Sequence, residues 1–149
     1  MPTLFASSDQ GLSTYLYNEF KRGIVTSTNQ SLNNLWKELY LGIREANNVI
    51  ANVPNIDMDE ELKHRIIGEA KFLRALHYFN LVRCFGEVPL RTSPVEAGDD
   101  QGLAVSTIVE IYDSIIDDLN YASLYCWGRN ESRGNYTNDL GRATNTSAH

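Results

Sequence analysis

Apolar residues recur every three or four positions along residues 31–53, a spacing that predicts a long amphipathic helix. The main stripe consists of Leu32, Leu35, Leu39, Ile43, Ala46, Ile50 and Val53, and a second stripe beside it of Trp36, Tyr40 and Asn47. Ser31 is the expected N-cap of this helix. Pro54 is its expected end, because proline has no backbone N–H with which to continue the hydrogen-bond ladder.

Residues 58–85 form the second predicted helix, and their apolar side chains cover more than one of its faces. A helix with two apolar faces packs between neighbours rather than lying on a surface. Asp57 is the expected N-cap, with Glu60 at the reciprocal position of a capping box. Gly86 ends the helix and Pro89 follows closely, an order typical of helix C-termini.

A third helix is predicted over residues 107–121, after a proline- and glycine-rich connector at 86–105 with a short extended piece at 88–90. Thr107 and Glu110 have the spacing of a capping box at the start of this helix. One face carries Ile108, Tyr112, Ile115, Leu119 and Ala122, and Asp113, Asp117 and Asp118 are expected on the other side.

The two ends of the chain have weaker patterns. Residues 12–20 predict a short helix, and residues 124–142 are polar, contain several glycines and are expected to be mobile. The last residues begin a further element, for which Thr144 is a suitable N-cap. We therefore predict an all-α fold of antiparallel helix pairs, with a segment of short helix and loop at 1–30 and a helical region at 31–149.

Composition narrows the class of protein without changing this fold. The 149 residues are 42% hydrophobic and 21% charged, which is typical of a folded domain. The formal net charge is −6 and the sequence pI is about 5.0, so no basic face for nucleic acid is expected. No stretch approaches the ~18 apolar residues of a membrane-spanning helix. Two cysteines make no disulfide framework, and Cys84 is expected to be a small core residue.

The sequence predicts no metal site. His64 and His77 lie on different turns of the second helix, and no further ligands stand at zinc spacing. Acidic residues alternate at 57–61 as in a calcium loop, but Leu62 occupies the position of the required turn glycine. These acids are better explained by the favourable field at a helix N-terminus.

No enzymatic activity and no cofactor are predicted either. Asp113 and Asp117 form an acidic pair that is expected to face solvent, where both carboxylates are simply hydrated. Phosphate-loop, dinucleotide and nucleophile-elbow motifs do not occur. Tyr125 and Trp127 stand in a loop-like region, where aromatic side chains either stack on sugars and partners or form a local core. A local core is the favoured interpretation.

The segment EAKFLRALHYFNLVRCFGEVPL at residues 69–90 strongly resembles a signature of the SusD/RagB family, the nutrient-uptake lipoproteins of Bacteroidetes-type outer membranes. Three further segments resemble the family in the same order along the chain. They are Trp36-x-x-x-Tyr40-x-x-Ile43-x-x-x-Asn47, Glu110-Ile111-Tyr112-x-x-Ile115-x-x-Asp118-Leu119-x-x-Ala122 and Gly141-Arg142-Ala143-Thr144. Together they cover most of residues 32–149.

The resemblance implies tetratricopeptide-like helix pairs in a right-handed array, incomplete in this sequence, beside a variable ligand-binding part. It implies binding of an oligosaccharide or other nutrient at the cell surface, without catalysis, next to a SusC-like TonB-dependent transporter. Intact family members are several times longer and carry a lipoprotein signal with a lipidated cysteine. We therefore interpret the sequence as an N-terminal piece of a lipid-anchored outer-membrane protein, truncated at the start of a further helix.

The motif residues are interpreted as scaffold rather than as ligand contacts. They are Trp36, Tyr40, Asn47, Glu69, Arg74, Gly86, Pro89 and Tyr112, and the aromatic residues among them, with Phe72 and Phe79, are placed on core stripes. Arg74 and Glu69 are expected to pair with each other or with loop carbonyls.

Candidate ligand contacts lie in the segment before the first predicted helix of the repeat. They are Tyr15, Tyr17, Arg22 and Asn29, since aromatic rings stack on sugars and Asn or Arg groups bond their hydroxyls. The alternative is a helical-repeat protein-interaction module that docks a partner chain, most plausibly the transporter, and has no ligand site of its own.

Overall fold

The computed structural model describes Gly23, Thr26 and residues 29–95, 102–128, 131–133, 136–137 and 141–148. Contacts divide the chain into two compact units, Met1–Glu38 and Leu39–His149. The predicted division at residue 30 stays a prediction, because most of the first 28 residues lie outside the described ones.

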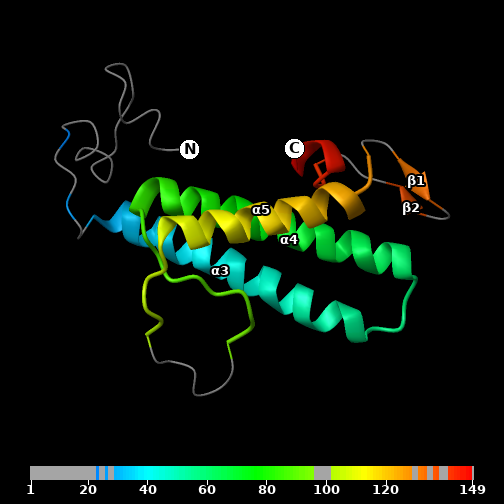
Figure 1. Cartoon of the computed structure of the whole chain (residues 1–149), viewed down its shortest axis with the longest axis horizontal. Helices are drawn as coiled ribbons and strands as arrows, with labels where there is room; N and C mark the ends of the chain where they lie inside the picture. The colour runs from blue at the N-terminus through cyan, green and yellow to red at the C-terminus, as the bar shows by residue number, and fades with distance from the viewer. Residues whose placement is uncertain are drawn as a thin grey trace. The chain divides into compact units, whose positions relative to one another are not determined.

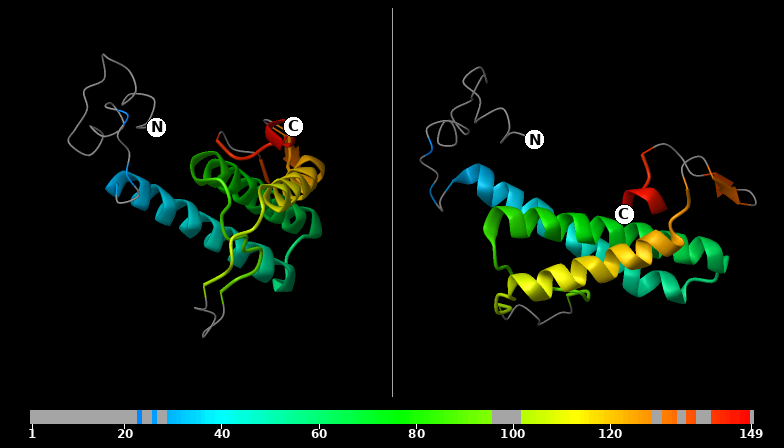
Figure 2. Two further views of the ribbon diagram at one scale, coloured as in Figure 1. Left: turned by 60° about the vertical axis from the view of Figure 1, so that its left-hand side comes forward. Right: turned by 45° about the horizontal axis from the view of Figure 1, so that its top comes forward.

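The described residues form three α-helices, α3 (Gln30–Asn52), α4 (Glu60–Phe85) and α5 (Ile108–Tyr125), with a 3-10 turn, η2 (Val53–Asn55), after α3. Within the second unit, the later part of α3 runs antiparallel to α4, and α4 runs antiparallel to α5 (Figures 1 and 2). The predicted all-α class and the three helices are confirmed.

Regular structure outside these helices is short. A hairpin pairs β1 (Ser132–Arg133) with β2 (Tyr136–Thr137), and a 3-10 helix, η3 (Asn145–Ala148), packs against α5. In the connector, Ser106 donates its N–H to the carbonyl of Val88 at 3.0 Å, which confirms the short extended piece. The predicted element near the end of the sequence is η3.

The helix starts show which cap predictions hold. At α5, the capping box of Thr107 and Glu110 is present as predicted. At α4, Asp59 rather than Asp57 is the N-cap, because its carboxylate reaches the N–H of Leu62 at 2.9 Å. At the other end of α4, Gly86 has φ +75°, a conformation that glycine adopts without strain, as the predicted helix end requires.

The core of the second unit lies where the three helices face one another. From α3 it takes Leu39, Ile43 and Ala46, from α4 Ile67, Ala70, Ala75, Tyr78, Leu81 and Val82, and from α5 Ile111, Ile115 and Ala122. Within the second unit, the predicted apolar stripe of α3 is therefore confirmed. On α5 the buried stripe is rotated from the predicted one, since Ile108 is exposed and Asp118 is buried.

Three residues predicted to be core are exposed. Phe79 and Tyr112 are each 37% exposed, and Cys84 is also exposed. By their helical spacing, Cys84 lies on the side of α4 that carries the exposed Leu73 and Leu76. The apolar surface of α4 is two-sided, as predicted, but the described residues cover only part of it.

Close packing joins α3 to α4 at Gly42. A Cβ added there would lie 2.3 Å from Nε2 of His77, so the glycine gives the imidazole its space. Burial lowers the pKa of His77, which favours the neutral ring at this contact. None of the described helices is both long enough and apolar enough to cross a membrane.

Candidate functional site

Asn29 is the one predicted ligand residue that the structure describes, since Tyr15, Tyr17 and Arg22 lie outside the described residues. Its side chain is buried, and its carbonyl oxygen accepts the N–H groups of Ser31 at 2.9 Å and Leu32 at 3.2 Å. Asn29 is therefore the N-cap of α3 in place of Ser31, because its amide oxygen reaches two otherwise unpaired N–H groups. A ligand role for these four residues stays a prediction.

A buried ion pair joins α4 to α5 at Arg74 and Asp118. Nε of Arg74 donates to Oδ2 of Asp118 at 2.7 Å, and Nη2 donates to Oδ1 at 2.8 Å. Nζ of Lys71 donates to Oδ1 at 2.8 Å. Both residues of the pair are at most 5% exposed, so two cations meet one carboxylate in a nearly dry setting. The pairing of Arg74 with Glu69 is wrong, because Asp118 takes the guanidinium.

The same arginine also binds the connector, as the alternative prediction stated. Nη1 of Arg74 donates to the carbonyl of Thr92 at 3.0 Å and to Oδ1 of Asn47 at 2.7 Å. Nδ2 of Asn47 in turn donates to the carbonyls of Arg91 and Ser93, each at 3.1 Å. The side chains of two helices thus hold the backbone of three consecutive connector residues.

Two tyrosines also form hydrogen bonds with the connector backbone. Tyr40 donates to the carbonyl of Pro89 at 2.7 Å, and Tyr78 bonds both the N–H and the carbonyl of Arg91, at 2.7 and 2.9 Å. Burial raises the pKa of both phenols, so each keeps the proton that it donates. We call Tyr40, Asn47, Arg74, Tyr78 and Asp118 the connector clamp. Its contacts hold helices and connector together. The scaffold role of the motif residues within it stays a prediction.

Glu69 forms a second, more exposed ion-pair group. Its Oε1 accepts Nε of Arg65 at 2.9 Å and Nε of Arg142 at 3.0 Å, and its Oε2 accepts Nη2 of Arg142. The guanidinium of Arg65 lies 4.1 Å from the ring centroid of Trp127, which is 2% exposed. The local core role favoured for Trp127 is confirmed.

An open hollow lies beside this group, with a volume of about 540 Å³. Phe72, Leu73 and Leu76 of α4 form one side, and Arg142, Ala143 and Ser147 form the other. The buried Cys126 packs close to Gly68, and burial raises the pKa of its thiol to about 11. The thiol is therefore protonated and acts as a small apolar group.

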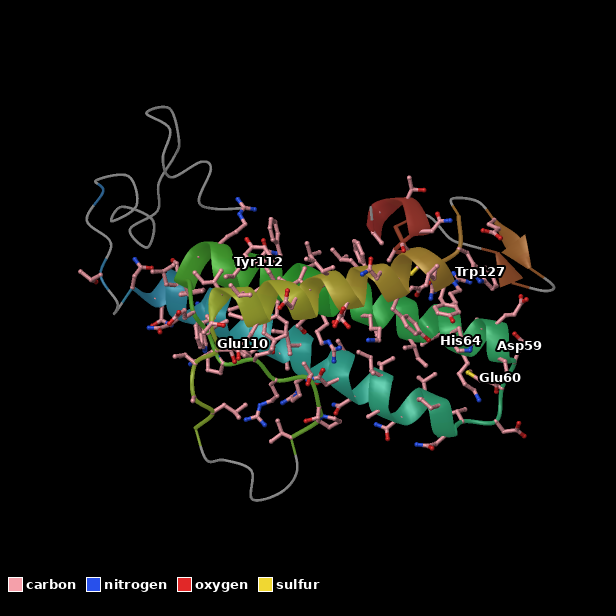
Figure 3. The ribbon with its side chains drawn as sticks, viewed as in Figure 1. Asp59, Glu60, His64, Glu110, Tyr112 and Trp127 are labelled. Carbon is pink, nitrogen blue, oxygen red and sulfur yellow. The ribbon has the colours of Figure 1, made fainter. Side chains whose placement is uncertain are left out.

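A cluster of three rings lies where α4 begins and α5 ends. His64 stacks on Tyr125 with ring centroids 4.7 Å apart and an interplanar angle of 17°, and Nδ1 of His64 is 2.8 Å from the hydroxyl of Tyr121. Tyr121 and Tyr125 have centroids 4.5 Å apart. Figure 3 shows His64 and Trp127 in this part of the molecule and Tyr112 near the opposite end of α5.

No cluster of three or more His, Cys, Asp or Glu side chains suited to a metal occurs in the part of the chain that the structure describes. The polar groups gathered instead are hydrogen-bond donors and acceptors and aromatic rings.

Sequence reasoning missed Asp118 and the ring cluster. Asp118 lies three residues after Ile115 and four before Ala122, which is the spacing of a buried stripe, but its charge led to a solvent-facing prediction. Tyr121 and Tyr125 stand four residues apart on one side of α5, but their partner His64 comes from another helix. Spacing within one helix does not reveal such a partner.

Known proteins share the sequence and the fold of this chain. A SusD-like family model, described as starch-binding and associating with the outer membrane, matches residues 5–132. SusD-like protein P25 of Formosa agariphila is 32% identical over 102 residues, which cover 68% of this chain and 19% of that protein. The chain thus spans about a fifth of the length of that curated relative.

Two solved structures resemble the chain closely. A laminarin-binding SusD-like protein has a TM-score of 0.83 and 30% identity, over 99% of this chain and 32% of the other. A crystal structure with a xylogluco-oligosaccharide has a TM-score of 0.78 and 30% identity, over 91% of this chain and 26% of the other. The predicted tetratricopeptide-like helical fold is confirmed by these SusD-like neighbours. Since the family model covers most of the chain, the protein belongs to the SusD-like family, which is associated with the outer membrane.

Proposed function

We propose that the protein binds glycans without modifying them, as part of a nutrient-uptake system at the cell surface. The observation that carries this proposal is the fold match at 30% identity to a protein described as laminarin-binding. The described residues favour binding over catalysis, since their polar groups are engaged in holding helices and connector together.

Delivery of the bound glycan to a SusC-like TonB-dependent transporter is the finer part of the proposal. In it, the intact protein is lipid-anchored and exposed at the outer surface of the outer membrane. The family description supports the membrane association, and the resemblance in sequence suggests the partner and the anchor.

Within the chain, we propose that Tyr15, Tyr17, Arg22 and Asn29 contact the glycan. Their residue types suit this role, because phenol rings stack on sugar faces and a guanidinium bonds hydroxyls.

Calorimetric titration with laminari- and xylogluco-oligosaccharides tests the proposal. Saturable binding is expected, together with a loss of about tenfold or more in affinity when Tyr15→Ala and Tyr17→Ala are combined. Tyr112→Ala is the control, because this exposed tyrosine lies on α5. Absence of binding to every neutral oligosaccharide tried contradicts glycan binding, and unchanged affinity in the double variant contradicts the residue assignment alone.

A second candidate function, a protein-docking module, is favoured by the apolar side chains that α4 exposes. Leu73 is 48% exposed and Leu76 43%, one turn apart on the same side. Contiguous apolar surface of this kind marks interaction sites. A pull-down with the neighbouring transporter, lost in Leu73→Asp and retained in Leu124→Asp, would favour docking, especially if no oligosaccharide binds.

A further inference from the structure

We propose that His64, Tyr121 and Tyr125 form a stacking platform for a β-gluco-configured oligosaccharide, with the Tyr125 ring as the contact face. The inference rests on the glycan-binding function proposed above and assigns it contact residues other than Tyr15 and Tyr17. It starts from the geometry of the three rings at the end of α5.

Tyr125 is held from two directions. Its ring is nearly parallel to the imidazole of His64, at 4.7 Å and 17°, and tilted by 40° against Tyr121 at 4.5 Å. His64 is itself fixed, because its Nδ1 and the hydroxyl of Tyr121 are 2.8 Å apart. The ammonium of Lys71 lies 5.2 Å from the ring centroid of Tyr121 and anchors that ring from α4.

The cluster nevertheless stays open to solvent. Tyr125 is 39% exposed and its neighbour Leu124 is 76% exposed, whereas Trp127 two residues further on is 2% exposed. The phenol hydroxyl of Tyr125 has no hydrogen-bond partner among the residues that the structure describes, so a donor and acceptor remains at the rim of the ring.

This combination suits a sugar ring. The all-equatorial hydroxyls of a β-glucopyranose leave axial C–H groups on both faces, so each face is apolar and its edge is polar. An aromatic ring matches the apolar face, and a phenol hydroxyl reaches the polar edge. An axial hydroxyl, as in a galacto-configured sugar, interrupts one of these faces and leaves the other apolar.

Fixing the ring before binding lowers the cost of binding. A free tyrosine side chain loses rotamer freedom when a ligand orders it, and this loss weakens binding. Here the contacts with His64 and Tyr121 have already restricted Tyr125. His64 and Tyr121 are therefore positioning residues, and Tyr125 is the contact residue.

Calorimetric titration of the chain with a laminari-oligosaccharide tests the platform through matched variants. Tyr125→Leu keeps the apolar volume and removes the flat ring, and a loss of about tenfold in affinity is expected. Tyr125→Phe keeps the ring and loses only the hydroxyl, so a loss of about threefold is expected. Tyr112→Leu is the control, since Tyr112 is 37% exposed on the same helix and has no ring partner among the described residues.

The possible outcomes separate the two proposals. If the unaltered chain binds and Tyr125→Leu binds within twofold of it, the platform is refuted and glycan binding stands. If the unaltered chain binds no oligosaccharide, the proposed function itself fails and the platform fails with it.

A footprint on the unaltered chain covers the case in which Tyr125→Leu fails to fold. Nitration by tetranitromethane, followed by mass spectrometry, reports the accessibility of each tyrosine. A saturating laminari-oligosaccharide is expected to slow nitration of Tyr125 at least fivefold and to leave Tyr112 unchanged. Equal nitration of Tyr125 with and without the bound sugar would refute the platform.

Discussion

Two arginine–carboxylate pairs that each include a residue of α4 have the same chemistry but differ strongly in burial. Arg74 and Asp118 have side chains that are 6% and 3% exposed, whereas Arg142 and Glu69 are 40% and 14% exposed. Both guanidinium groups bind their carboxylates through two nitrogens. The comparison therefore sets a buried and an exposed example of the same kind of ion pair side by side.

The difference shows how much each pair depends on its partner. Water hydrates an exposed ion whose partner is removed, so the pair contributes little net stability. A buried ion left without its partner has no such alternative and is strongly destabilising. The buried pair is also part of the connector clamp, whereas Glu69 retains Arg65 when Arg142 is lost.

The largest effect is expected from Asp118→Ala. The substitution leaves Arg74 buried without its carboxylate and removes the acceptor of Lys71, which is expected to cost about 3–5 kcal/mol of unfolding free energy. Urea denaturation followed by circular dichroism measures it. The adjacent Asp117→Ala is the control, since Asp117 is exposed and is expected to change stability by less than about 0.5 kcal/mol. A loss below about 1 kcal/mol in Asp118→Ala would mean that burial does not distinguish the pairs.

A smaller loss of stability is expected from Gly42→Ala. This substitution tests whether close packing, in addition to the clamp, holds α3 against α4. The new methyl group would overlap the ring of His77, and overpacking costs about 1–3 kcal/mol. Alanine recovers up to about 1 kcal/mol through its helix propensity, so a net loss of about 1–2 kcal/mol is expected. His77→Ala in the same chain should restore most of it. A Gly42→Ala chain as stable as the original would show that the interface yields easily.

Tyr78→Phe removes one hydroxyl from the clamp and leaves the ion pair intact. The N–H and the carbonyl of Arg91 lose their shared partner, and a loss of about 1 kcal/mol is expected. Hydrogen exchange should show faster exchange at residues 91–93, with α5 little changed. Tyr112→Phe, on the exposed side of α5, serves as the control. Equal exchange in both variants would mean that the hydroxyl does not hold the connector.

The fold was largely predictable because periodicity and caps are local signals. The stripe from Leu39 to Ala46, the capping box at Thr107 and the helix end at Gly86 all follow from neighbouring residues. The cap of α4 was misplaced by two residues because Asp57 and Asp59 are equally suitable in the sequence. Only the reach of the carboxylate to Leu62 decides between them.

The site was less predictable because it depends on contacts between distant segments. The charge of Asp118 predicts a solvent-facing side chain. Its burial is explained only by the ion pair with Arg74, which lies on another helix. Glu69 was paired within its own motif, whereas its partner Arg142 lies 73 positions further along the chain. The partner of a buried charge is set by packing, which a single sequence pattern does not contain.

The smallest effect is expected from Arg142→Ala, the exposed counterpart of Asp118→Ala. Because Glu69 keeps its bond to Arg65 and Arg142 is 40% exposed, a loss below about 1 kcal/mol is expected. This loss should shrink further between about 0.05 and 1 M salt, since screening shortens the reach of an exposed charge, whereas the loss in Asp118→Ala should persist. Urea denaturation of both variants at the two salt concentrations measures the contrast. If Arg142→Ala proves as costly as Asp118→Ala, the Glu69 group is a structural centre equal to the clamp, and burial alone does not rank the two pairs.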